Sequence, residues 1–157
     1  MFDWLAVKVR NWLDVPVKIE FMKLAPNAKM PHRAKPTDAG FDIYALHDFT
    51  IQSRTVRTVH TGVAFVAPPG WYYTIEGRSG SWKHGIVPCR GIMDSTYSGE
   101  IMVAVHNHGP DHFTIAEGER FAQLTVHKYV PIEIVEVDKV SDSYAGRGAA
   151  GHGSTGR

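Results

Sequence analysis

Short β-like segments separated by turn residues run through most of this 157-residue chain, and this pattern constrains its fold more than any other feature. The segments are rich in Val, Ile, Thr and aromatic residues, whereas the stretches between them collect Gly, Pro, Asn and Asp. Many short strands joined by turns are typical of a closed or two-sheet β architecture. We therefore expect an all-β domain. The predicted strands are 17–24, 41–46, 56–66, 71–76, 100–107, 120–130 and 132–137.

The N-terminal end does not follow the β pattern. Apolar residues recur there at steps of three and four, which predicts a short helix over roughly residues 2–13 that ends before Pro16. We expect this helix to cap the domain or to lie across a subunit contact. A membrane-surface or partner-binding helix is the alternative, although the segment is short and carries acidic as well as basic residues.

The C-terminal end differs in composition. Residues 146–157 contain five glycines and no apolar side chain larger than alanine. Such a segment cannot bury a core, so we expect a flexible Gly-rich arm that becomes ordered only when something binds it. The chain then divides into an N-terminal helical extension (1–16), a β domain (17–138) and a C-terminal arm (139–157).

Composition narrows the possible partners and compartment. The formal net charge is only +1, so we expect no nucleic-acid partner, and an anionic substrate must be held by locally placed arginines. The single cysteine, Cys89, allows no intrachain disulfide and no multi-cysteine zinc site, which fits the reducing cytoplasm. No apolar run approaches the ~18 residues that span a bilayer, and no signal peptide is recognisable, so we expect a cytoplasmic protein without a membrane partner.

Five polar segments interrupt the β pattern, and two of them are suited to binding phosphate. In residues 76–85, small residues surround Arg78, Ser79 and Gly80, so that backbone N–H groups can approach an anion while the guanidinium and hydroxyl bond its oxygens. The C-terminal arm offers a similar set. Its polar residues are Arg147, His152, Ser154 and Thr155.

The other three segments supply carboxylates, an aromatic ring and an amide. Residues 38–45 include Asp42, residues 91–100 include Asp94 and Tyr97, and residues 118–124 include Gln123. A carboxylate before a turn, as at Asp94, can stay ionised at the edge of a cleft and orient a water molecule. Taken singly, each segment is as well explained by ordinary turn, packing or surface residues.

Together, and in this order, the five segments resemble the five motifs of the trimeric dUTPases over roughly residues 17–157. The motifs are Ala-Gly-Phe-Asp-Ile-Tyr-Ala, Gly-Arg-Ser-Gly, Gly-Ile-Met-Asp-Ser-Thr-Tyr-Ser-Gly-Glu, Gly-Glu-Arg-Phe-Ala-Gln-Leu and Gly-His-Gly-Ser-Thr-Gly. The resemblance implies a jelly-roll-like β-barrel or sandwich and a homotrimer in which each active site is shared by all three subunits. It also implies hydrolysis of dUTP to dUMP and pyrophosphate by water attack on the α-phosphorus. That reaction keeps uracil out of DNA and supplies dUMP for dTTP synthesis.

The resemblance assigns one group of residues to the nucleoside. Asp94 is expected to orient the attacking water and to bond the deoxyribose 3′-hydroxyl. Tyr97 is expected to pack under the sugar and to leave no room for a 2′-hydroxyl. Backbone groups of a hairpin at about 86–91, Gly91 among them, are expected to read the uracil edge. His152 stands where many relatives have a phenylalanine that stacks over the uracil.

A second group is assigned to the triphosphate. Arg78, Ser79 and Gln123 are expected to bond the phosphates and the water, with Gly80 in the same loop. The resemblance implies Mg²⁺ held by the substrate phosphates, with Asp42 supporting the metal and water network and no direct protein ligand. The arm residues expected to close over the terminal phosphates are Arg147, Ser154 and Thr155.

The residues in the expected uracil hairpin and the N-terminal residues 1–16 leave alternatives open. Arg90 and Cys89 occupy the expected uracil hairpin, where small residues are common in the family, so base selectivity is a separate question. The rivals are a dCTP deaminase-like or bifunctional relative, and a dUTPase-like nucleotide-sensing or partner-binding module that uses residues 1–16. We find no convincing additional acid or base for deamination in the hairpin region.

Overall fold

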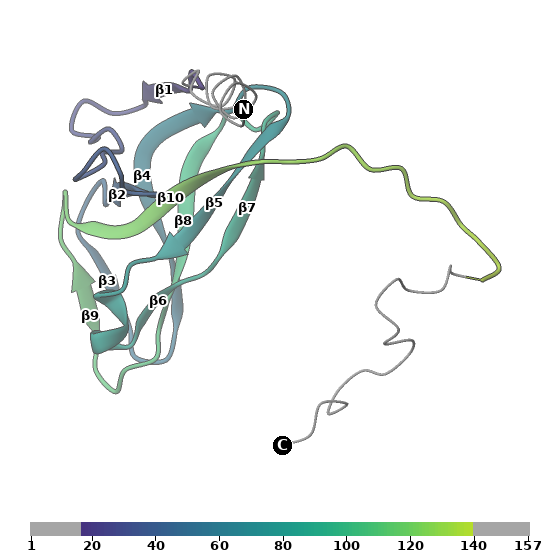
Figure 1. Ribbon diagram of the computed structural model, residues 1–157. Helices are drawn as coiled ribbons and strands as arrows, with labels where there is room; N and C mark the ends of the chain where they lie inside the picture. The colour runs from purple at the N-terminus through teal and green to yellow at the C-terminus, as the bar shows by residue number, and fades with distance from the viewer. Residues whose placement is uncertain (1–16, 140–157) are drawn as a thin grey trace, which may run out of the picture.

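The computed structural model describes residues 17–139 and contains ten strands and one 3₁₀ helix (Figure 1). The expected N-terminal helix and the polar residues of the glycine-rich arm lie outside the described residues. No helix among the described residues is long and apolar enough to cross a membrane. The elements are β1 (Glu20–Lys23), β2 (Phe41–Tyr44), β3 (Phe49–Ile51), β4 (Val56–Val66), β5 (Trp71–Gly77), η1 (Ser81–His84), β6 (Ile86–Pro88), β7 (Gly91–Asp94), β8 (Glu100–Asn107), β9 (Phe113–Ile115) and β10 (Arg120–Lys128).

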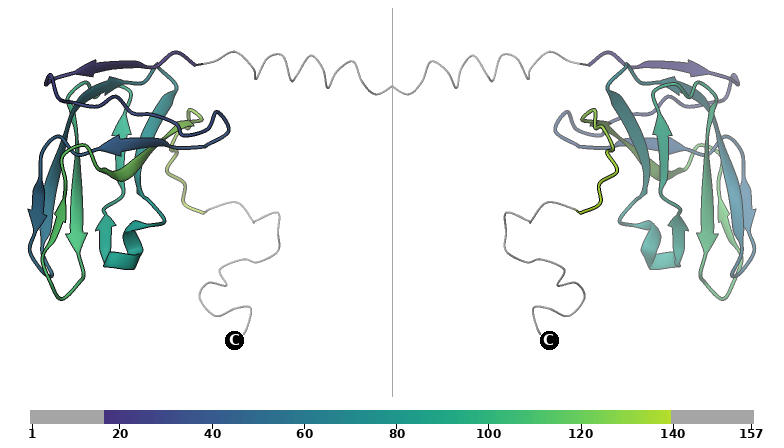
Figure 2. Two further views of the ribbon diagram at one scale, coloured as in Figure 1. Left: turned by 90° about the vertical axis from the view of Figure 1, so that its left-hand side faces the viewer. Right: turned by 90° about the vertical axis from the view of Figure 1, so that its right-hand side faces the viewer.

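Two four-stranded antiparallel sheets form the domain. Their strand orders are β1-β4-β8-β6 and β2-β10-β5-β7, and β3 pairs with β9 in a small third sheet. Figure 2 shows η1 at one end of the domain and β1 at the other. The chain passes from the first sheet to the second between β6 and β7, because β6 pairs with β8 whereas β7 pairs with β5. The all-β prediction is therefore confirmed.

The core is built from side chains that both sheets direct inward. In β8 the residues at every second position, beginning with Ile101, are buried, as period-two alternation requires. Tyr73 of β5 is fully buried and contacts Phe65 of β4 edge to face, with ring centroids 4.0 Å apart. Burial of each large apolar side chain stabilises the fold by about 1.5–3 kcal/mol. The largest buried side chains are Tyr73, Phe65, Ile43, Ile51, Ile75, Ile101, Ile115 and Leu124.

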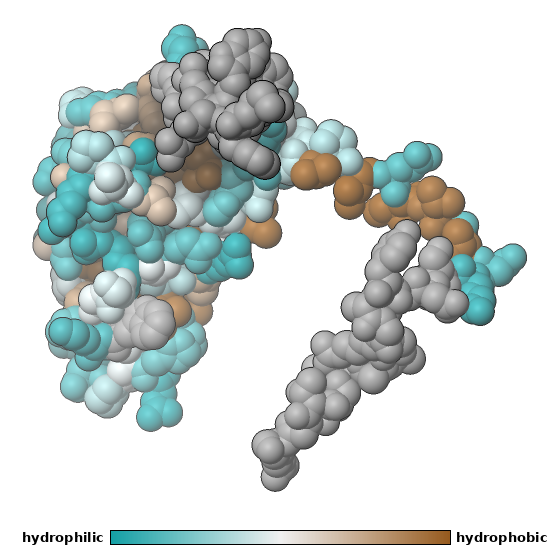
Figure 3. All heavy atoms as spheres, viewed as in Figure 1, coloured by the Kyte–Doolittle hydropathy of each residue, from teal (hydrophilic) through white to brown (hydrophobic). Residues whose placement is uncertain are grey.

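The expected strand over 132–137 is wrong for the described chain. Residues 131–137 form no strand, and the segment leaves the domain after β10 (Figure 1). Its apolar side chains are exposed, with Ile132 at 81% and Ile134 at 90%, and Figure 3 shows them as a hydrophobic run beyond the domain. The segment has strand-forming residues, but a strand also needs a neighbouring strand to accept its hydrogen bonds, and no described strand does so.

Candidate functional site

The middle of the site is a pair of neighbouring strand positions. Asp42 of β2 lies directly opposite Gln123 of β10 in the antiparallel register. The side-chain amide of Gln123 donates a hydrogen bond of 3.0 Å to the carbonyl of Gly77, the last residue of β5. Gly40 leaves room for the Gln123 side chain, because a Cβ at residue 40 would lie 2.7 Å from Gln123 Oε1. The first, second and fourth polar segments therefore meet within one chain.

The carboxylate of Asp42 binds two guanidinium groups. Its Oδ1 lies 2.9 Å from Arg78 Nε, and its Oδ2 lies 3.1 Å from Arg120 Nη1. Arg78 Nη1 also donates to the carbonyl of Arg120 at 3.1 Å. The Asp42 carboxylate holds both guanidiniums in fixed orientations, and the outer N–H groups of the two arginines can still donate to a further anion. This arrangement is suited to an anionic ligand.

A cavity of about 390 Å³ opens over this cluster. Ser79 and Asp38 line it together with Arg78, Arg120 and Gln123. Its lining is mostly polar, with small residues at Ala34, Ala39 and Gly40 that leave the backbone accessible. We refer to it as the arginine pocket. It has the donors that a chain of phosphate oxygens requires.

Arg120 is the functional candidate that sequence reasoning missed, and a β-bulge explains why. Strict alternation would place Arg120 and Gln123 on opposite faces of β10. The register shifts between Arg120 and Ala122, and the consecutive residues Phe121 and Ala122 are both buried. The extra residue resets the alternation, so Arg120 and Gln123 line the same pocket. No feature of the sequence alone identifies this bulge.

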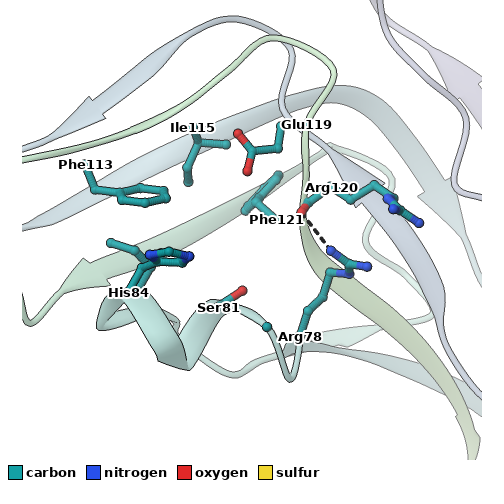
Figure 4. A pocket seen from close by; sticks show the side chains of 10 residues that line it. Arg78, Ser81, His84, Phe113, Ile115, Glu119, Arg120 and Phe121 are labelled. Atoms are coloured by element: carbon teal, nitrogen blue, oxygen red, sulfur yellow. Dashed lines mark hydrogen bonds between the residues drawn. The ribbon is translucent and has the colours of Figure 1, made fainter.

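A second hollow of about 230 Å³ also borders Arg78 and Arg120 (Figure 4). Phe113, Ile115 and Phe121 form its apolar side, and Ser81 and His84 of η1 face them. Gly80 lines this hollow rather than the arginine pocket. The Arg120 side chain points away from the hollow, while its carbonyl accepts the bond from Arg78.

Asp94 and Tyr97 lie elsewhere on the described chain. Asp94 ends β7 opposite Tyr72, whereas Arg78 follows the far end of the same partner strand, β5. Six residues of extended chain separate Tyr72 from Arg78, which corresponds to about 20 Å. The exposed Asp94 instead borders a cavity of about 550 Å³ lined by Trp71, Ile92 and Tyr129 among others. One chain thus does not bring the third segment to the arginine pocket.

The third segment forms a loop closed by two hydrogen bonds. Tyr97 N–H donates to the carbonyl of Asp94 at 3.0 Å, and the Tyr97 hydroxyl donates to the carbonyl of Glu100 at 2.8 Å. Tyr97 is 38% exposed, so part of the residue is accessible to a ligand. Burial raises the pKa of the nearby Tyr73 phenol far above its usual value, and the neighbouring Tyr97 adds to this effect. Tyr73 is therefore neutral at physiological pH.

Glu100 was not singled out from the sequence, although it ends the third segment. Burial raises its pKa, but hydrogen bonds from His60 and from the backbone at Gly62 and Thr61, together with the charge of His60, outweigh burial and leave the pKa below its usual value. The carboxylate is therefore ionised under ordinary conditions.

The expected uracil hairpin differs in form from the prediction. Gly91 begins β7 and pairs with Ile75 of β5, whereas Val87 of β6 pairs with His106 of β8. Residues 89–90 therefore cross between the two sheets instead of closing a β6–β7 hairpin. Cys89 N–H is bonded to the carbonyl of Ala104 at 2.7 Å, and Arg90 reaches Glu76 at 3.1 Å. The remaining predicted residues, Arg147, His152, Ser154 and Thr155, lie outside the described part of the chain.

Comparison with known proteins gives one consistent family. The model of the family described as dUTPase matches residues 26–156. Deoxyuridine 5′-triphosphate nucleotidohydrolase of Saccharomyces cerevisiae is 42% identical over 145 residues, covering 91% of this chain and 96% of the relative. A mutant dUTPase of Staphylococcus bacteriophage 80alpha, solved with dUpNHpp, matches with a TM-score of 0.83 at 25% identity over 89% of this chain and 99% of that one. A mutant dUTPase from phage phi11 of S. aureus, which coordinates a structural Mg(II) ion, has the same fold, with a TM-score of 0.75 at 23% identity over 78% of this chain and 97% of that one.

Proposed function

This chain belongs to the dUTPase family and hydrolyses dUTP to dUMP and pyrophosphate, and we propose that the arginine pocket holds the triphosphate during this reaction. The observation that carries the proposal is the Asp42 carboxylate, which fixes Arg78 and Arg120 at 2.9 and 3.1 Å beside Gln123. Fixed cations and amide donors stabilise the charge that develops on phosphate oxygens when water attacks phosphorus. Ser79 adds a hydroxyl at the edge of the same pocket.

Asp94 is the proposed residue that orients the water. It is an exposed carboxylate beside a cavity with an apolar wall, and it is close in the chain to Tyr97, the proposed support for the sugar. A carboxylate within hydrogen-bond reach of a water can orient it and accept its proton as the new P–O bond forms. The pyrophosphate leaves from the side opposite the water, so the attacking and leaving oxygens must lie in line. Gln123 is proposed to fix the position of the water.

The active site in this proposal is assembled between copies of the chain. Asp94 and Arg78 stand about 20 Å apart along β5, too far to act on one phosphorus atom. A second copy that presents its Asp94 and Tyr97 to the arginine pocket removes this difficulty. The exposed apolar segment 130–137 offers surface for such an assembly, because each of its large side chains gains stability from burial. We propose a homotrimer, as in the family that the motifs resemble, with the polar arm residues closing each site.

Mg²⁺ is proposed as the cofactor, bound mainly by the substrate. Among residues 17–139 there is no cluster of three or more His, Cys, Asp or Glu that could hold a metal ion. Both oxygens of Asp42 already bind arginines, although each retains capacity for a water. These donors fit an ion that keeps several waters and binds phosphate oxygens. When bound, Mg²⁺ neutralises charge on the phosphates, and the protein residues orient them.

A cytoplasmic site of action belongs to the same proposal.

A pyrophosphate-release assay with dUTP, UTP, dTTP and dCTP tests this function. We expect dUTP to be strongly preferred, whereas preferred turnover of dCTP would favour a deaminase-like relative.

Asp94→Asn should leave the protein folded and assembled but reduce kcat by about a hundredfold or more, because the amide cannot accept the proton of the water. The matched control is Asp111→Asn, in an exposed loop at the far end of β8, which should keep wild-type turnover. Wild-type kcat in Asp94→Asn would remove Asp94 from the mechanism.

A further inference from the structure

We propose that Glu100, held by His60 and by the backbone of Gly62, is a positioning residue for Tyr97 and in this way contributes to the selection of deoxyribose over ribose. This inference rests on the function proposed above, in which Tyr97 supports the sugar.

The Glu100 side chain ties the start of β8 to β4. Its Oε2 lies 2.9 Å from His60 Nδ1, and its Oε1 accepts a hydrogen bond of 2.8 Å from the N–H of Gly62. The β4–β8 register is interrupted between His60 and Ala64, where Gly62 has a φ of 66°. In this bulge the regular ladder to β8 is missing, and the carboxylate of Glu100 supplies an acceptor in its place.

The bulge at Gly62 is closely packed and accepts no side chain. A Cβ at Gly62 would lie 2.7 Å from Leu46 Cδ1, and the positive φ disfavours any other residue. Thr61 adds a hydroxyl bond of 2.7 Å to the carbonyl of Ile101. The Glu100 backbone is therefore held against a closely packed part of β4, through both its own side chain and its neighbour Ile101.

Tyr97 depends on that fixed backbone. Its hydroxyl donates to the carbonyl of Glu100 at 2.8 Å, so the ring folds back over Gly99 toward the first residue of β8. Gly99 permits this, because a Cβ there would lie 2.7 Å from Tyr97 Oη. The other end of the loop is held by the pairing of Asp94 with Tyr72. The position of the ring thus follows the position of the Glu100 carbonyl, which the side chain of Glu100 sets through β4.

The contacts that link β4, Glu100 and Tyr97 affect the choice between deoxyribose and ribose. A ring that excludes a 2′-hydroxyl must be held within a fraction of an ångström, since a wall that yields admits the larger sugar. A purely structural Glu100 would lower stability and affect the two nucleotides equally. A positioning Glu100 would change the ratio of their kcat/KM values while the folded fraction stays the same.

The experiment compares kcat/KM for dUTP and UTP in Glu100→Ala and Glu100→Gln, using pyrophosphate release by the assembled full-length enzyme. We expect the dUTP-to-UTP ratio to fall about tenfold in Glu100→Ala, because both side-chain anchors are lost. Glu100→Gln retains an acceptor for Gly62 N–H and should lie between that variant and wild type. The control, Ser53→Ala, removes a hydrogen bond of 2.7 Å to the carbonyl of Gly109 and should leave the ratio unchanged.

Tyr97→Phe tests whether Glu100 acts through the tyrosine hydroxyl. It removes the bond to Glu100 and keeps the ring, so the effects of Tyr97→Phe and Glu100→Ala on the ratio should not add in the double variant. If Glu100→Ala does not fold, Glu100→Gln takes its place in this cycle. A wild-type ratio in the folded Glu100 variants, or full additivity, overturns the positioning role. Absence of dUTP hydrolysis in the wild-type chain would instead overturn the function on which the role rests.

Discussion

Asp42 connects sequence to chemistry at the scale of a single residue. Its carboxylate separates two arginines that would otherwise repel each other, and the short contacts to Arg78 and Arg120 hold them at the arginine pocket. The Asp42 side chain is only 16% exposed, which shields its contact with Arg78 more than its contact with the half-exposed Arg120. We propose that Asp42 orders the two arginines before the substrate binds.

Asp42→Asn should reduce kcat/KM for dUTP by about ten- to a hundredfold, because the amide binds only weakly to guanidiniums that then lose their orientation. Steady-state kinetics together with circular dichroism measure the effect at an unchanged fold. The matched control is Glu20→Gln, which removes an ion pair with Lys18. The side chains of Lys18 and Glu20 are 85% and 71% exposed, so this substitution should leave kcat/KM unchanged. Equal effects of the two substitutions would mean that the Asp42 contacts do not matter for the reaction.

The ionised Glu100 carboxylate makes the free energy of unfolding depend on pH. Its folded-state pKa lies below the usual value of 4.5, although burial alone acts in the opposite direction. A depressed carboxyl pKa stabilises the fold above the unfolded-state pKa, and this contribution is lost as the pH falls through the folded-state pKa. The difference in unfolding free energy between wild type and Glu100→Gln should thus be larger at about pH 7 than at about pH 3. Urea unfolding at the two pH values measures it, and a constant difference would contradict the ionised state.

At the scale of the elements, every strand longer than four residues was predictable, whereas most of the shorter ones were not. The segments 56–66 and 100–107 coincide with β4 and β8, since each holds enough residues for composition and flanking turns to be recognised. The strands β3, β6, β7 and β9 have three or four residues and were missed, whereas the four-residue strands β1 and β2 lie within the predicted segments 17–24 and 41–46. Such short strands exist because a longer neighbour accepts their hydrogen bonds, which no local pattern reveals.

The same distinction applies to the site. Motif residues such as Asp42, Arg78 and Gln123 were identified from the sequence and lie together. Arg120 was missed because a bulge sets its direction, and Glu100 was missed because its partners, His60 and Gly62, lie some 40 residues away in the chain. Local residue types therefore identified polar groups that the fold brings together, whereas pairing between distant strands determines how these groups are held.

The segment that was wrongly predicted as a strand gives a prediction of its own. Ile134 is 90% exposed in the described chain, and we propose that assembly covers the segment around it. Ile134→Asp should weaken the oligomer, because a buried unpaired carboxylate is costly, while leaving the domain fold intact. Sedimentation velocity over a range of concentrations tests this, with Glu133→Gln as a control in the same segment. An unchanged oligomer in Ile134→Asp would show that the segment is not part of the interface.

At the scale of the whole molecule, we propose that one copy of the chain does not form a complete active site. The groups proposed to orient water and sugar lie at one end of β5, and the groups proposed to hold phosphate lie at the other. Symmetric oligomers resolve such a separation by placing one end of a subunit against the other end of its neighbour. Sharing of the site between subunits predicts that two inactive variants restore activity when they are mixed.

Arg78→Ala and Asp94→Asn should each be nearly inactive alone, yet mixing them under conditions that exchange subunits should restore activity. A shared site is complete when its arginine comes from an Asp94→Asn subunit and its carboxylate from an Arg78→Ala subunit. In an equal random mixture about one quarter of the sites meet both conditions, so we expect about a quarter of wild-type kcat. A mixture of Asp94→Asn with Asp42→Asn should also regain activity, because Asp42 belongs to the arginine pocket. Arg78→Ala with Asp42→Asn should not, since both substitutions damage the same half. No recovery in the first pair would place the whole site within one chain. Recovery in the last pair would mean that Arg78 and Asp42 serve one site from different subunits, against the single-chain arginine pocket.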